Sequence, residues 1–155
     1  MAEVDIRPFT ERDVDDVRRL IAEYGASLAF DLGFQAFDDE LADLPGRYAP
    51  PDGALFVATA GGRTIGCVGL RSLGDGTCEL KRLYVRPEHR GGGTGRRLVD
   101  AALGEARRRG YLRMRLDTVP GMEGAQALYE RLGFREIAAY TDNPVAGARF
   151  LELVL

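Results

Sequence analysis

A run of glycines separates a strand pattern from a helix pattern in the second half of the chain. Four of the five residues from 91 to 95 are glycine, within the segment Arg90-Gly91-Gly92-Gly93-Thr94-Gly95-Arg96-Arg97. Polarity alternates before this segment, and apolar residues recur at helical spacing after it, from Leu98 to Ala106. The first backbone amides of a helix lack internal partners and carry partial positive charge. Because glycines leave such amides uncovered, the segment predicts a seat for phosphate oxygens.

Known phosphate-binding patterns narrow the choice of ligand. The P-loop pattern GxxxxGK[ST] fails, because no Gly-Lys pair occurs here. The dinucleotide pattern GxGxxG also fails, since a count from Gly91 places Arg96 at the third glycine position. The spacing Arg-x-x-Gly-x-Gly does fit, at Arg90, Gly93 and Gly95. A nucleotide-binding domain is therefore disfavoured.

The fitting pattern resembles the diphosphate-binding signature of the GNAT superfamily of N-acetyltransferases. The segment LYVRPEHRGGGTG at 83–95 resembles the family's fourth strand and loop, and ALYERLGF at 127–134 resembles its last helix and following turn. The resemblance implies direct transfer of an acetyl group from acetyl-CoA to an amine in a ternary complex. It also implies the following cofactor-binding residues: Leu83, Tyr84, Val85, Arg90, Gly91, Gly92, Gly93, Thr94, Gly95 and Arg96.

Glu79 is the candidate general base implied by this resemblance. It precedes Arg90 by 90 − 79 = 11 residues, the distance at which family members with a glutamate base on this strand place it. A base matters because an amine of pKa about 10.4 costs roughly 4.6 kcal/mol to deprotonate at neutral pH. The alternative is a surface glutamate paired with Lys81 or Arg113.

Tyr129 is the candidate general acid implied by the resemblance. It occupies the tyrosine position of ALYERLGF, and its phenol would protonate the leaving sulfur. The alternative is a tyrosine that only packs against the sheet. The sequence departs from many relatives at Met122, where they carry a cofactor-contacting asparagine.

The strand before the glycine loop changes its polarity pattern midway. Apolar residues occupy even and then odd positions: Cys78 and Leu80, then Leu83 and Val85. One inserted residue produces such a change, so we expect a β-bulge within 81–83. In the resembling family a bulge here opens the gap that holds the pantetheine arm, which Leu83 and Val85 would contact through their backbones. The alternative is an unbulged edge with Lys81 and Arg82 in solvent.

The order of elements predicts one α/β (α+β) domain over residues 1–155. Helix patterns of linking length favour parallel strands, while tight turns such as Gly61-Gly62 favour hairpins. We expect a mixed, twisted sheet of about seven strands with helices on both faces. Expected strands lie at 4–9, 54–60, 64–73, 78–85, 111–119, 134–138 and 148–155, and expected helices at about 10–24 (ended by Gly25), 38–44, 95–109 and 122–132.

Composition bears on binding to nucleic acid, on membrane insertion and on cellular location. The net charge of −3 provides no basic field for nucleic acid. No apolar stretch reaches the ~20 residues of a membrane span, and the first residues lack a signal-peptide centre, so we expect a cytoplasmic protein. Cys67 and Cys78 are expected to be buried thiols, and a single histidine makes a metal site implausible.

The acceptor amine is not specified by the sequence. In the resembling fold the acceptor side is formed by the first helices and the last strands, here about 24–37 and 140–149. Three aromatic residues suggest a partly apolar wall, either as core filler or as one side of a pocket: Phe30, Phe34 and Phe37. An amine of a small molecule, amino acid or protein stays open, as do a non-catalytic acyl-CoA-binding module and pairing of two copies through late strand edges.

Overall fold

A single mixed sheet organises the chain. The computed structural model describes residues 3–28 and 37–155. In this part, seven strands pair in the order β1-β2-β3-β4-β5-β7-β6, which confirms the expected sheet. β4 and β5 are parallel, and the other neighbours are antiparallel. The strands are β1 Val4–Pro8, β2 Ala54–Ala60, β3 Arg63–Gly74, β4 Thr77–Val85, β5 Arg113–Thr118, β6 Arg135–Ile137 and β7 Arg149–Val154.

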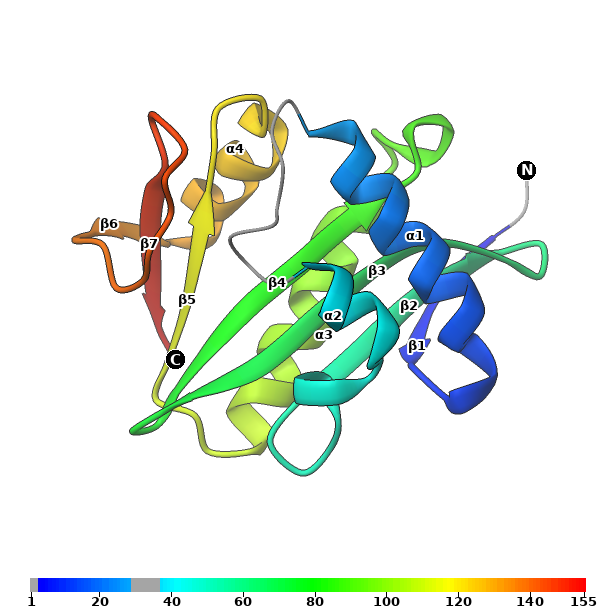
Figure 1. Cartoon of the computed structure of the whole chain (residues 1–155), viewed down its shortest axis with the longest axis horizontal. Coiled ribbons are helices and arrows are strands. Elements are labelled where there is room, and N and C mark those ends of the chain that lie inside the picture. Colours follow the sequence, from blue (N-terminus) through cyan, green and yellow to red (C-terminus); the bar gives the residue numbers. More distant parts are fainter. Residues whose placement is uncertain (1–2, 29–36) are drawn as a thin grey trace.

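Helices cover both faces of the sheet, as expected. α1 (Val14–Ser27) and α2 (Phe37–Ala42) lie on one face, and α3 (Thr94–Arg108) and α4 (Glu123–Leu132) lie on the other (Figure 1). The described residues also form three short 3-10 helices: η1 Glu11–Asp13, η3 Gly46–Tyr48 and η4 Pro87–His89.

Alternating side chains of β2 divide the interior into two cores. Phe56 and Ala58 belong to the core under α3 and α4, whereas Leu55 and Val57 belong to the core under α1 and α2. Successive residues of a strand point to opposite faces, so a strand covered on both sides is apolar throughout. β2 is therefore a central strand that fixes both helical layers.

The predicted end of the first helix at Gly25 is wrong, because α1 continues to Ser27. A Cβ at Gly25 would lie 2.8 Å from the ring of Phe37. Glycine at this position therefore allows α2 to approach α1 closely and does not end the helix. The predicted helix at 38–44 is also shifted, and α2 begins and ends earlier.

A β-bulge lies at Arg82, within the expected range. Cys67 pairs with Tyr84 and Gly69 pairs with Lys81, so two residues of β4 oppose one of β3. Arg82 has φ +59, a left-handed conformation that is uncommon for a residue with a side chain. The alternative that Lys81 and Arg82 face solvent is wrong, since both are buried.

β4 and β5 separate after Glu79, ahead of the bulge. They pair only between Thr77–Glu79 and Arg113–Arg115, and Figure 1 shows them diverging from their shared end. Residues of both strands line a cavity along this divergence.

Candidate active site

The glycine loop presents open backbone donors. Gly91 and Gly93 have φ of +86 and +84, and Gly93 precedes the first turn of α3. Within the described chain, no backbone N–H from 91 to 96 donates a hydrogen bond, and the first to do so belongs to Arg97, toward the Gly93 oxygen at 3.0 Å. A Cβ at Gly95 would meet no atom within 4 Å. Open donors beneath open space fit a diphosphate.

The arginines beside the loop are partly engaged by the protein itself. Arg90 Nε donates to the Val85 carbonyl oxygen at 2.7 Å, and its guanidinium lies 5.5 Å from the Tyr84 ring centre. This oxygen of Val85, one of the predicted contacts for the pantetheine arm, thus already accepts one hydrogen bond. Arg96 pairs with Asp100 at 3.3 Å, and both side chains are about half exposed.

A cavity of about 490 Å³, here called the main cavity, adjoins the loop. Its volume lies in the range of small-molecule and cofactor sites. The predicted cofactor residues that line it are Leu83, Tyr84, Val85, Arg90, Gly91, Gly93, Thr94 and Gly95; the predicted residues Gly92 and Arg96 are not among its lining. Met122, the position that departs from relatives, also lines it. The site therefore joins the loop to the segment before α4.

A smaller cavity of about 50 Å³, the inner cavity, lies where β4 and β5 separate. It shares Leu83 and Met122 with the main cavity. Tyr129 of α4 lines it, as do Lys81 and Asp117, whose strand neighbours Leu80 and Leu116 point into the core under α3 and α4. Side chains from both faces of the sheet thus meet in the gap between the strands.

Tyr129, the candidate general acid, lines the inner cavity from α4. Its ring packs against Phe134 with centroids 5.6 Å apart, and only 7% of the residue is exposed. Burial raises the pKa of the Tyr129 phenol, so it stays protonated at neutral pH. Its hydroxyl donates no hydrogen bond to another described residue. It can therefore serve either role open to it, packing or proton donation.

Glu79 is buried and held by two partners that the sequence did not predict. Arg71 Nε donates to its Oε1 at 2.7 Å, and the Tyr140 hydroxyl donates to its Oε2 at 2.6 Å. The expected alternative pairing with Lys81 or Arg113 is wrong, because Arg71 lies directly opposite Glu79 in the β3–β4 register. Glu79 lines neither the main nor the inner cavity.

A buried group of polar side chains in the inner cavity was missed by sequence reasoning. Lys81 Nζ lies 3.4 Å from Asp117 Oδ1, and each side chain is 6% exposed. The Asn143 amide donates to Asp117 Oδ2 at 3.0 Å. Burial lowers the pKa of Lys81, and the attraction of Asp117 only partly offsets this. A charged side chain facing a cavity beside the candidate cofactor site is a candidate for catalysis.

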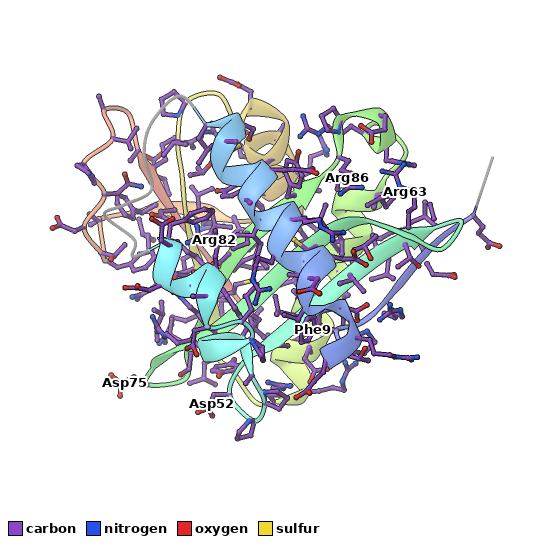
Figure 2. The ribbon with its side chains drawn as sticks, turned by 45° about the vertical axis from the view of Figure 1, so that its right-hand side comes forward. Phe9, Asp52, Arg63, Asp75, Arg82 and Arg86 are labelled. Carbon is purple, nitrogen blue, oxygen red and sulfur yellow. The ribbon has the colours of Figure 1, made fainter. Side chains whose placement is uncertain are left out.

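Arg82, at the bulge, closes the other side of this region. It forms two hydrogen bonds to the Glu40 carboxylate, at 2.7 and 3.0 Å, and lies 5.1 Å from the Phe37 ring centre. Figure 2 shows Arg82 beneath α1 and α2. Arg82 of β4 thus holds α2 over the sheet through Glu40. Phe37, one of the three phenylalanines singled out in the sequence, packs against Arg82. Phe30 and Phe34 lie outside the described residues.

Other expected features have simpler outcomes. Cys67 and Cys78 are free and buried, as predicted, and burial raises the pKa of each thiol to about 12. Across residues 3–28 and 37–155, no cluster of three or more His, Cys, Asp and Glu side chains could hold a metal ion. No helix in the same ranges combines the length and apolar character needed to span a membrane. The single histidine, His89, lines the main cavity.

Comparisons with known sequences agree on one family. The profile of the Acetyltransferase (GNAT) family matches residues 15–134. An uncharacterized N-acetyltransferase of Schizosaccharomyces pombe is 40% identical over 144 residues, covering 92% of this chain and 88% of its own. The uncharacterized N-acetyltransferase YjgM of Escherichia coli is 36% identical over 124 residues, covering 78% and 73%.

Solved structures share the fold over nearly the whole chain. The PaiA N-acetyltransferase of Thermoplasma acidophilum, solved with coenzyme A, superposes with a TM-score of 0.77 at 19% identity, covering 99% of both chains. The yncA protein of Salmonella typhimurium, solved with acetyl-CoA, gives 0.75 at 24% identity, covering 97% of this chain and 93% of its own.

Proposed function

Because the chain belongs to the GNAT family of acetyltransferases, we propose that it transfers the acetyl group of acetyl-CoA directly to an acceptor amine in a ternary complex. It is an acyltransferase, and acetyl-CoA is its co-substrate. The observation that carries the proposal is the glycine loop: its backbone N–H groups from 91 to 96 donate no hydrogen bond within the described chain, and Gly91, Gly93, Thr94 and Gly95 line the main cavity. The cytoplasmic address, the single domain over 1–155 and pairing of two copies stay predictions.

The glycine loop and the gap between β4 and β5 would bind different parts of the cofactor. The N–H groups of the loop would hold the diphosphate, since they combine unpaired donors with the positive end of α3. The pantetheine arm would follow the main cavity to Leu83 and Met122, where the inner cavity begins. This path would bring the thioester beside Tyr129.

The reaction needs a neutral amine, a polarised carbonyl and an accommodated thiolate. The amine nitrogen forms a bond to the thioester carbon, the carbon–sulfur bond breaks, and the nitrogen loses one proton while the sulfur gains one. We propose that Tyr129 supplies the proton to sulfur, because it lines the inner cavity with a protonated phenol. The products are an N-acetylated acceptor and free CoA thiol.

Two carboxylates compete for the role of proton acceptor. Sequence reasoning selects Glu79, whose oxygens already accept hydrogen bonds from Arg71 and Tyr140. Asp117 lines the inner cavity itself, and a base must lie within hydrogen-bond reach of the proton it removes. The geometry therefore favours Asp117, with Glu79 acting through a water as the alternative.

Calorimetry with acetyl-CoA, followed by an assay of thiol release with pooled amines, tests the function. Gly95→Glu places a carboxylate in open space against the diphosphate seat, so acetyl-CoA affinity should fall by at least about tenfold. Gly104→Glu adds the same charge farther along α3, at a position that lines neither cavity, and should bind normally. Binding without thiol release would favour a non-catalytic acyl-CoA-binding module, and no binding would refute the proposal.

A further inference from the structure

The sheet face beneath α1 and α2 changes from apolar to charged toward β4 and β5. Charged side chains there are buried or partly buried in oppositely charged pairs, and burial of a charge is costly unless it is paired. Four such pairs occur among the described residues of this region: Arg71–Glu79, Arg82–Glu40 and Arg115–Glu152, each at 2.7 Å, and Lys81–Asp117 at 3.4 Å. Each charged side chain of these four pairs thus has a partner of opposite charge among the described residues.

The Lys81–Asp117 pair differs from the other three. It has the longest separation, and both of its members line the inner cavity. Asn143 holds the second oxygen of Asp117, which fixes the carboxylate and directs Oδ1 toward Lys81. This pair is thus the one that faces an incoming acceptor beside Tyr129.

Charge balance restricts what can enter this place. A simple amine brings one extra positive charge to the buried Lys81–Asp117 pair, whose two charges already compensate each other, and a carboxylic acid brings one extra negative charge. A molecule with both an ammonium and a carboxylate brings none, and it offers each member of the pair an opposite charge. The small volume, about 50 Å³, suits the charged end of a small acceptor.

We propose that the acceptor is an amino acid or a similar small zwitterion, whose ammonium binds Asp117 and whose carboxylate binds Lys81. This rests on the proposed function and deepens it. The acceptor separates the two side chains and pairs with each, so all charges stay compensated. The amine is then held beside Asp117, at the end of the cavity that Tyr129 lines. Lys81 positions the acceptor and selects it by its carboxylate.

Matched acceptors test the inference. Thiol release from acetyl-CoA is measured with all standard amino acids, and then with the decarboxylated amine and the amide of each active one. The amino acids should be used with kcat/KM at least about a hundredfold above their matched amines, because a site built for a carboxylate rejects analogues that lack it. Comparable kcat/KM for the amines would overturn the inference and leave the acetyltransferase intact.

Two variants test whether Lys81 recognises the carboxylate, because a purely structural role of Lys81 would not change the preference for the amino acid over its amine. Lys81→Met should lower kcat/KM for the amino acid by at least about tenfold and raise the relative use of the amine, since Asp117 then prefers a lone cation. Arg115→Met removes a cation from the same face outside both cavities and should leave the preference unchanged. Equal losses for both acceptors in Lys81→Met would overturn the role of Lys81.

Acetyl-CoA calorimetry on every sample separates failure of this inference from failure of the function. If wild-type protein binds acetyl-CoA but none of the amino acids causes thiol release, the inference is overturned and the proposed function is not. Protein that binds no acetyl-CoA refutes the function and the inference together. The wild-type comparison decides the acceptor class even where a variant does not fold.

Discussion

The Tyr140 hydroxyl donates a hydrogen bond of 2.6 Å to Oε2 of Glu79, across 61 residues of sequence. Arg71 holds the other oxygen of the same carboxylate. Side chains of the protein thus occupy both oxygens of Glu79, and Glu79 lines neither the main nor the inner cavity. Glu79 of β4 therefore links β3 to the segment before β7. The catalytic roles of Glu79 and Asp117 can be compared by substitution.

We expect Asp117→Asn to lower kcat far more than Glu79→Gln. Asp117 lines the inner cavity, so its loss should cost about a hundredfold or more in kcat. Glu79→Gln should cost under about tenfold in kcat but lower the free energy of unfolding by about 2–4 kcal/mol, since Arg71 loses its buried partner. Steady-state kinetics and urea unfolding measure the two effects. The opposite order of kcat losses would restore Glu79 as the base.

Tyr129→Phe should lower kcat by at least about tenfold with little change in acetyl-CoA affinity. The phenol hydroxyl makes no hydrogen bond to another described residue, so its removal leaves no buried group unpaired. Calorimetry and thiol release on the same sample separate binding from turnover. Tyr111→Phe, remote from both cavities, is the matched control. Unchanged turnover would remove Tyr129 from the mechanism.

Local patterns were sufficient to predict most of the sheet. The hairpin at Gly61-Gly62 and the bulge at Arg82 both follow from residues adjacent in sequence, by turn chemistry and by a change of alternation. The end of α1 was missed because Gly25 makes room for the ring of Phe37, which belongs to another helix. Glycine alone does not distinguish a helix end from a close approach.

The charged part of the site was harder to predict. Lys81 and Asp117 are separated by 36 residues and meet only because β4 and β5 lie side by side. Nothing local distinguishes a buried charged residue from an exposed one on a strand. The Arg71–Glu79 pair was equally hidden: counting back from the Asp75-Gly76 turn places Ser72 opposite Glu79, and only a register shift between Ser72 and Gly74 brings Arg71 there.

Gly93→Ala should destabilise the protein, whereas Gly95→Ala should not. Gly93 has φ +84, a conformation that costs a residue with a side chain roughly 1–2 kcal/mol. Gly95 lies in α3, where its Cβ would meet open space and alanine favours the helix by about 0.5–1 kcal/mol. Urea unfolding of both variants without ligand measures the difference. Equal stabilities would contradict the loop conformation described here.

Asp13 should contribute stability that is lost in acid. The two hydrogen bonds from Arg7, with those from Thr10, hold the pKa of Asp13 at about 2, below its ordinary 3.8. Because the folded-state pKa is the lower one, the contribution is complete above about pH 4 and disappears as pH falls through 2. The side chain of Arg7 is 42% exposed, so solvent screening reduces the contribution to about 1 kcal/mol. Urea unfolding of wild type and Asp13→Asn should therefore differ by this amount at pH 7 and converge between pH 4 and 2. Asp100→Asn, whose pair with Arg96 is half exposed, is the control and should match wild type throughout; a difference for Asp13→Asn that stays constant with pH would contradict the assignment.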